Sequence, residues 1–310
     1  MTQHYRYSIR SILEGERVSI KNILLILLVI LIGAEAILLS LLTEIRWVLV
    51  LSAAAIAYGF LSTIVAARKL FFLASASPHS ALLAVVLAIP LARLSPIGDE
   101  YSWAVIIGTL LVYAIGYAIH RGVDPDTATA TFVALTASLS VISIYFVLTN
   151  FPLEADIMDI IVGDPLLAGW NETLYALVVA GLTAIAVTMT YREQVCLGID
   201  RDSVKLSGIR TAYYDALTFA LLAVTTVALI KIVGFVLEHV LLLLPAAISS
   251  SVSNSSRESI LISVTSSLSA SLVGLYLSTL VNLAPAGVTG LVLMLIYVMA
   301  LAAKRRRVTL

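Results

Sequence analysis

Long apolar stretches, each about the length of a membrane-spanning helix, alternate along this chain with short polar connections. A helix that crosses a bilayer needs about 20 mostly apolar residues, and this measure predicts ten helices: 21–42, 47–67, 71–94, 102–120, 127–149, 171–190, 211–231, 233–249, 258–280 and 286–303. The seventh and eighth form one apolar run, which is interrupted only near Lys231 to Gly234. The pattern therefore predicts an all-α polytopic membrane protein with one transmembrane domain over 1–310, a bundle of about ten helices (8–10).

Composition supports a membrane protein. Hydrophobic residues make up 60% of the 310 residues and charged residues 12%, whereas soluble domains carry about 25% charged residues. The polar N-terminal segment 1–20 precedes an apolar run that is long enough to span and lacks a small-residue cleavage site, which predicts a retained first helix. The single cysteine, Cys196, excludes an internal disulfide and a multi-thiolate metal site.

The distribution of basic residues predicts which side each connection faces. With ten helices and a cytoplasmic N-terminus, sixteen of the nineteen Lys and Arg residues fall on the cytoplasmic side, as the positive-inside rule requires: Arg6, Arg10, Arg17, Lys21, Arg68, Lys69, Arg121, Arg192, Arg201, Lys205, Arg210, Arg257 and the tail 304–307. We therefore expect both termini, including the basic tail 304–310, in the cytoplasm of a multi-pass plasma-membrane protein. The outer connections are acidic, which either concentrates cations or simply reflects the exclusion of basic residues.

Three titratable side chains in the apolar runs are candidates for chemistry: His79, Glu238 and His239. An ionisable group at bilayer depth must face protein or water, and imidazole with carboxylate suits Zn, Mn or Fe(II). The alternatives are structural. His79 then caps a helix end, and Glu238 pairs with Lys231 two turns away.

Motifs for enzymatic chemistry are absent from the sequence. It contains no Walker A loop, no HExxH and no G-x-S-x-G, and the basic tail, already explained by topology, gives no reason to expect nucleic-acid binding. Asp124-Pro125-Asp126 has the character of a helix-capping turn, and the serines of the ninth helix, such as Ser263 and Ser267, favour close helix packing. We expect neither enzymatic activity nor a permanently bound cofactor.

Three passages resemble the transmembrane permeases of metal-ion (zinc/manganese/iron) ABC importers. The run 231–248, with Gly234 and Pro245, resembles the family's K-x-V-G-x-L-L-x-x-A-L-L-x-x-P-A-A signature. The run 274–289 is similar to its G-L-x-x-S-x-x-x-x-x-P-x-G-x-x pattern, at four matching positions: Gly274, Ser278, Pro285 and Gly287. The charged loop from Arg192, within the connection 191–210, is similar to the family's ATPase-coupling loop, which points to four coupling residues: Glu193, Leu197, Gly198 and Ile199.

The resemblance implies a permease that moves a divalent transition metal by alternating access. It also implies separate cytoplasmic ATPase subunits, an extracytoplasmic metal-binding protein and a second permease copy, with a homodimer expected. The family commonly shows D-x-x-x-H near the start of the third helix, and here Ser75 stands in the Asp position while His79 matches the His. Metal selectivity is therefore open. Two other functions stay open on the residues alone: an ATPase-independent ion-coupled secondary transporter or channel, and a structural or assembly protein of the membrane.

Overall fold

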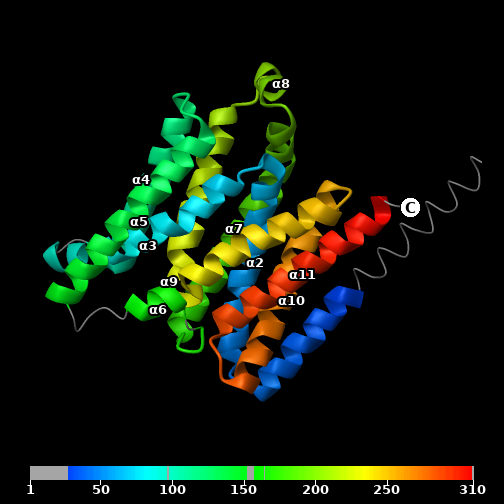
Figure 1. Ribbon diagram of the computed structural model, residues 1–310, viewed down its shortest axis with the longest axis horizontal. Coiled ribbons are helices and arrows are strands. Elements are labelled where there is room, and N and C mark those ends of the chain that lie inside the picture. The colour runs from blue at the N-terminus through cyan, green and yellow to red at the C-terminus, as the bar shows by residue number, and fades with distance from the viewer. Residues whose placement is uncertain (1–26, 96–97, 152–156, 164, 309–310) are drawn as a thin grey trace, which may run out of the picture.

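The structure is a bundle of helices, shown as a ribbon in Figure 1. This computed structural model describes residues 27–95, 98–151, 157–163 and 165–308, and every regular element in those residues is a helix. The polar segment 1–20 and the start of the predicted helix 21–42 lie outside the described residues, as do the last two residues of the basic tail. Within the described ranges, the all-α prediction is confirmed.

Eight helices are long and apolar enough to cross a membrane: α2 (Ile45–Arg68), α3 (Phe71–Leu94), α4 (Glu100–His120), α5 (Pro125–Asn150), α7 (Trp170–Ile199), α9 (Thr211–Val252), α10 (Ser256–Val281) and α11 (Pro285–Val308). A shorter apolar helix, Leu27–Leu42, precedes them. Two six-residue helices, α6 (Ile157–Val162) and α8 (Arg201–Leu206), lie in the connections. All ten predicted apolar segments are helical where they are described, because α9 contains the seventh and the eighth.

Polar caps set the starts of several helices. The Asp99 carboxylate accepts a hydrogen bond from the Ser102 N–H at 2.9 Å at the start of α4. Asp124 does the same for the Thr127 N–H at the start of α5, where Pro125 occupies the first turn. These bonds satisfy N–H groups that have no partner within the helix, and the Ser102 hydroxyl and N–H lower the pKa of Asp99. The predicted capping role of Asp124 is confirmed.

The long helix α9 is two helical arms joined at Gly234. This residue has φ 76° and ψ 160°, a conformation open essentially to glycine alone. The first arm runs from the end that carries α8 toward the opposite end, and Figure 1 shows the second arm turning back from Gly234. The interruption predicted near Lys231 to Gly234 is therefore a sharp change of direction.

A second glycine, Gly163, follows α6 and lies directly against this turn. A Cβ on Gly163 would lie 2.2 Å from the carbonyl oxygen of Val233, and a Cβ on Gly234 would lie 2.3 Å from the Gly163 nitrogen. Real Cβ atoms essentially never come this close to another backbone. The two main chains touch without any side chain between them, so α6 is held in the bend of α9.

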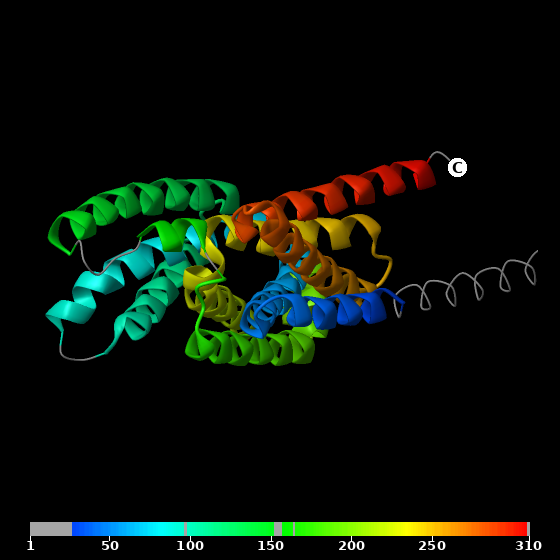
Figure 2. The ribbon, with the colours of Figure 1, turned by 90° about the horizontal axis from the view of Figure 1, so that it is seen from below.

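The interior of the bundle is built around α2, α3 and α9, whose apolar stretches are mostly buried. Figure 2 shows α5, α7 and α11 on the outside of the bundle, where many of their apolar side chains are exposed. Small residues join α2 to α10: a Cβ on Gly59 would lie 2.9 Å from the Val264 Cα, and the Ser62 and Ser263 hydroxyls lie 2.7 Å apart. The predicted packing role of the α10 serines is confirmed.

Replacement of Gly234 by alanine tests the contact in the bend of α9. We expect Gly234→Ala to destabilise the protein by at least about 2 kcal/mol, because the new Cβ overlaps Gly163 and the φ value is strained. Gly181→Ala in α7 is the control, since nothing lies within 4 Å of its added Cβ. Thermal unfolding of both purified variants in detergent measures the difference. Equal midpoints for the two would show that the backbones do not need this contact.

Candidate functional site

Two of the three predicted titratable residues, His79 and His239, lie side by side in the interior. His79 is on α3 and His239 is on the second arm of α9, and their ring centroids are 5.2 Å apart in an edge-to-face arrangement. The Phe235 ring lies 5.0 Å from His79 and 4.5 Å from His239. Both imidazoles are half-buried. His79 lies in the third turn of α3, so the alternative in which it caps a helix end is wrong.

Both ring nitrogens of His239 face backbone carbonyl oxygens. Nδ1 lies 2.9 Å from the Phe235 oxygen one turn earlier on α9, and Nε2 lies 3.2 Å from the Ser75 oxygen on α3. A neutral imidazole has only one N–H to donate, so one of these contacts pairs two acceptors. A cation beside that nitrogen would relieve the repulsion. If Nδ1–H donates to Phe235, the arrangement that commonly orients metal-binding histidines, the free lone pair on Nε2 points toward α3.

Glu238 faces another way, although it is the neighbour of His239 in sequence. Successive residues of a helix point about 100° apart. The Glu238 side chain is fully buried, and Tyr58 on α2 lies close enough to interact with its carboxyl group. Among the described residues, neither Glu238 carboxylate oxygen nor the Tyr58 hydroxyl has a hydrogen-bond partner of good geometry. The structure thus separates Glu238 from the histidine pair.

Lys231 has a partner other than the one considered from the sequence. Its Nζ lies 2.9 Å from a carboxylate oxygen of Glu100 at the start of α4 and 4.9 Å from the ring centroid of Tyr101. The alternative in which Lys231 pairs with Glu238 is therefore wrong. This ion pair lies three residues before Gly234, and it ties the end of the first arm of α9 to α4.

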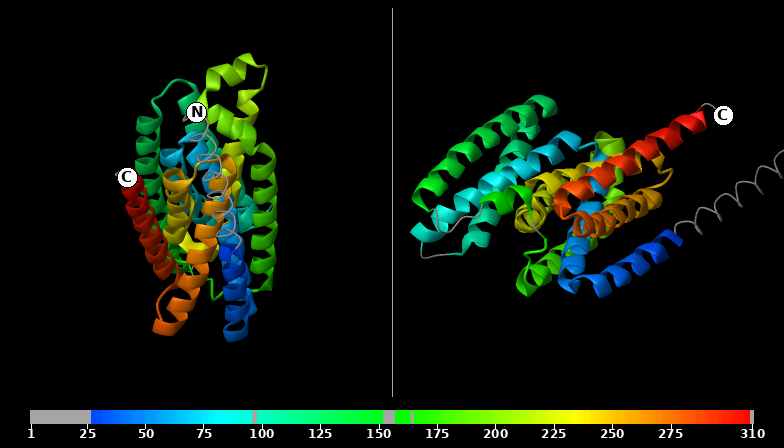
Figure 3. Two further views of the ribbon diagram at one scale, coloured as in Figure 1. Left: turned by 90° about the vertical axis from the view of Figure 1, so that its right-hand side faces the viewer. Right: turned by 60° about the horizontal axis from the view of Figure 1, so that its bottom comes forward.

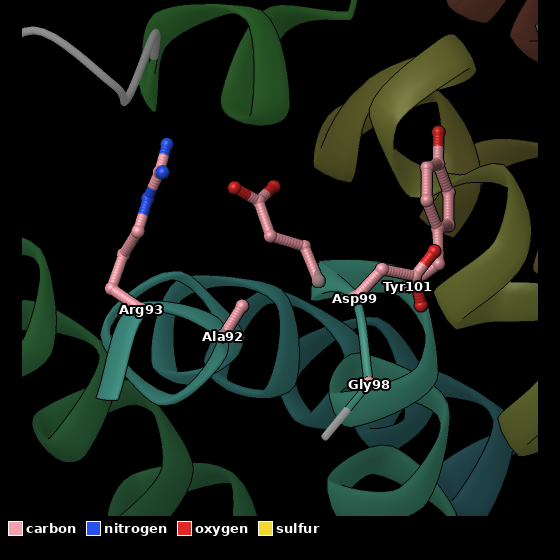
Figure 4. A pocket seen from close by; sticks show the side chains of 6 residues that line it. Ala92, Arg93, Gly98, Asp99 and Tyr101 are labelled. Carbon is pink, nitrogen blue, oxygen red and sulfur yellow. The ribbon is translucent and has the colours of Figure 1, made fainter. Parts of the chain in front are cut away.

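A pocket of about 370 Å³ opens beside this ion pair, where α3 ends and α4 begins. Its lining is polar and of mixed charge: Ala92, Arg93, Gly98, Asp99, Glu100 and Tyr101. Figure 4 shows the Arg93 and Tyr101 side chains rising from different helices on opposite sides of the pocket. Figure 1 shows that the junction between α3 and α4, where these residues lie, is away from α8.

The four predicted coupling residues occupy the end of α7. The prediction of a charged loop from Arg192 is wrong for its first part. Helix α7 continues to Ile199, because no residue from Glu193 to Ile199 breaks a helix. Asp200 then caps the short helix α8. Leu197 is buried, and Gly198 lies against α2, where an added Cβ would be 2.0 Å from the Ala67 oxygen. Ile199 is 80% exposed. Figure 3 shows α8 projecting beyond the long helices.

Most of the signature residues have structural roles in this fold. Gly234 forms the bend, Pro245 is buried within α9, and Pro285 begins α11. Gly274 on α10 lies so close to α11 that an added Cβ would be 2.1 Å from the Thr289 hydroxyl oxygen. The Ser278 hydroxyl donates to the Leu275 carbonyl within α10, and a Cβ on Gly287 would meet nothing within 4 Å.

Sequence reasoning missed the partners of several ionisable side chains: Tyr58 for Glu238, Glu100 and Tyr101 for Lys231, and Asp215 for Arg68 and Arg201. Tyr58 is the one tyrosine in the middle of the apolar α2, and Asp215 is the one carboxylate near the start of the apolar run of α9. Both features mark an ionisable or polar group that needs a partner. Among the described residues, no three His, Cys, Asp or Glu side chains gather as a metal cluster.

Comparison with known proteins places the chain in a transport family. The sequence profile of the ABC 3 transport family matches residues 40–304. The chain is 25% identical over 223 residues to the manganese transport system membrane protein MntB of Synechocystis, covering 67% of this chain and 73% of that protein. It is 23% identical over 227 residues to the manganese transport system membrane protein MntC of Listeria innocua, covering 67% and 80%.

A solved structure shares the fold. The chain superposes on a chain of PsaBC from Streptococcus pneumoniae, determined in complex with a Fab, with a TM-score of 0.73 at 20% identity. The match covers 86% of this chain and 94% of that one. Together with the eight spans, these matches describe a multi-pass permease of the plasma membrane. The chain belongs to the ABC 3 transport family.

Proposed function

We propose that this chain is the membrane-spanning subunit of an importer for a divalent transition-metal ion, driven by ATP hydrolysis on separate cytoplasmic subunits. The observation that carries the metal is the contact between His79 and His239 in the interior. The family match, and the manganese systems named for two relatives, support the class of transport. Zinc, manganese and iron are all within the proposal.

The histidine pair provides a weak, open site. Imidazole nitrogens bind first-row divalent ions, and a lone pair of His239 that faces a carbonyl oxygen gains when a cation arrives. A structural zinc site has four protein ligands, whereas this one offers two imidazoles and backbone oxygen. An ion held by so few groups also leaves readily, as transport requires.

Glu238 is the third group in the proposal. A buried carboxylate without a partner is unfavourable until a cation or a proton reaches it. Rotation of the second arm of α9 by one residue, about 100°, would exchange His239 for Glu238 on the face toward α3. On this proposal, such a rotation during alternating access would bring the two neighbouring residues into contact with one ion in turn.

The partners follow from the two ends of the bundle. The end that carries α8 also carries Arg68, Arg201 and Lys205 and is proposed to face the cytoplasm, with both termini on that side. There the exposed apolar side chains of Ile199 and Leu206 offer a surface to an ATPase. The opposite end, with the polar pocket beside Glu100, would meet an extracytoplasmic metal-binding protein. A second permease copy, expected to be identical, completes the assembly.

The ligand types bear on which metal is carried. The pair of imidazoles favours zinc or iron, whereas manganese prefers carboxylate oxygen. Ser75, one turn before His79, places a carbonyl oxygen beside His239 and brings no carboxylate. We infer that this site favours nitrogen-preferring ions over manganese more strongly than a site with a carboxylate at position 75 would.

Uptake by proteoliposomes tests the metal role of the three residues. With the cognate ATPase present, we expect ATP-dependent uptake of zinc or manganese to fall at least about tenfold in His79→Ala, in His239→Ala and in Glu238→Gln with His239→Ala, since a lost ligand typically costs more than 1.4 kcal/mol. His120→Ala, at the last residue of α4, is the matched control. ATPase copurification measured alongside should stay at the wild-type level. Wild-type uptake by the His79 and His239 variants would remove the pair from the pathway.

A carboxylate introduced at position 75 tests the selectivity argument. We expect Ser75→Asp to raise the ratio of manganese to zinc uptake at least about fivefold, because an oxygen ligand is added beside the two imidazoles. The control is Ser75→Asn: the asparagine side chain is nearly the same size as aspartate but carries no charge, so this variant should leave the ratio unchanged. Competition between the two ions at fixed total concentration gives the ratio directly. An equal change in both variants would attribute the effect to side-chain size.

A further inference from the structure

A buried ionic joint lies at the α8 end of the bundle, far from the histidine pair. Asp215, near the start of α9, accepts hydrogen bonds from two guanidinium groups on two other helices. Arg68, the last residue of α2, donates to Oδ1, and Arg201, the first residue of α8, donates to Oδ2. The side chains of Arg68 and Asp215 are 8% and 13% exposed, and that of Arg201 is 48% exposed. The interaction is therefore only partly screened by water on the α2 side.

The same joint includes α7. The second guanidinium nitrogen of Arg68 donates to the Gln194 side-chain oxygen at 3.2 Å and to the Thr218 hydroxyl at 3.4 Å. Gln194, which is fully buried, donates in turn to the Thr218 hydroxyl at 3.0 Å. One connected set of hydrogen bonds thus joins the ends of α2, α7 and α8 to the beginning of α9.

At the joint, the backbones of α7 and α2 are in direct contact. Because Gly198 has no side chain, the end of α7 packs directly on the Ala67 carbonyl of α2. Helix α2 ends one residue later at Arg68, and Lys69 follows in the left-handed conformation. A displacement of α8 would therefore be resisted at once by α2 and α9. Helix α2 also carries Tyr58, which faces Glu238 on the second arm of α9.

We propose that Asp215 is a positioning residue that couples movement of the 191–210 connection to α2 and α9. The Asp215 carboxylate accepts hydrogen bonds from both guanidinium groups, so a displacement of α8 would be transmitted to α2 and α9 through charge-assisted hydrogen bonds. The exposed Ile199 and Leu206 would receive the ATPase, and Asp215 would pass the movement inward. This inference rests on the proposed function, because it requires a cytoplasmic motor.

The Arg201 contact can be cut without leaving a buried charge unpaired, because Arg68 still neutralises Asp215. We expect Arg201→Gln to keep ATPase copurification and ATP hydrolysis at wild-type levels while the number of metal ions moved per ATP falls at least about fivefold, the lower end of coupling between linked sites. Arg201→Lys keeps the charge and should recover part of the ratio. Arg121→Gln, an exposed arginine at the end of α4 that contacts Tyr117, is the matched control.

The outcomes separate this inference from the proposed function. A wild-type complex that binds no ATPase, or moves no metal with ATP, would reject the proposed function. An active wild type with an unchanged ratio in Arg201→Gln, or a variant that loses the ATPase altogether, would overturn the role of Asp215. Thermal unfolding of Arg201→Gln, Asp215→Asn and the double variant gives a second readout without transport. Additive shifts in that cycle would show that the two side chains are not coupled.

Discussion

The contact between Gly163 and Gly234 is the constraint on which the rest of the interior depends. Without a side chain on either residue, α6 can lie in the bend of α9, and Gly234 can adopt the φ that turns the second arm back. That bend places Lys231 beside Glu100 at one end and brings His239 to α3 a few residues later. A straight helix of 42 residues would be about 63 Å long, twice the thickness of a bilayer's hydrocarbon core, and would carry these residues apart.

Polar groups in the interior are placed in two different ways. Lys231 and Glu100 satisfy each other, and the hydroxyls of Ser263 and Ser267 on α10 hydrogen-bond to α2, so these groups stabilise a fixed arrangement. The hydrogen bonds of His239 and Glu238 are incomplete. Both ring nitrogens of His239 face carbonyl oxygens, although a neutral imidazole has one N–H to donate. The Glu238 carboxylate has no hydrogen-bond partner among the described residues. Unsatisfied buried groups are unfavourable in a resting structure. Both residues lie on the second arm of α9, and on the proposed function a passing ion would complete them.

The sequence predicted those features that depend on local pattern. The apolar segments, the interruption near Gly234, the capping by Asp124 and the packing of the α10 serines all follow from residues close together in the chain. The pairings of charged residues did not follow, because they join distant positions: Lys231 with Glu100 across 131 residues, and Arg68 with Asp215 across 147. The charge of the stretch Glu193 to Ile199 favours a loop, but its residues are also compatible with a helix, and one face of that helix packs on α2. The contact of His79 with His239 does not follow from the sequence pattern either, because it depends on the direction that the second arm of α9 takes after Gly234.

The division of α9 into two arms bears on how a displacement at the α8 end could be transmitted to the histidine pair. The first arm is fixed at both ends, at Asp215 by two arginines and at Lys231 by Glu100, so a force at α8 would move it as one rigid piece. The second arm follows the first across Gly234, which has a glycine conformation that other residues do not adopt, and it also contacts α3 through His239 and α2 through Glu238. Helix α2 contacts both, through Arg68 at the joint and Tyr58 near Glu238. On the proposed mechanism, movement of the first arm relative to α2 would therefore reach the second arm, the element that carries His239 and Glu238, through the backbone at Gly234.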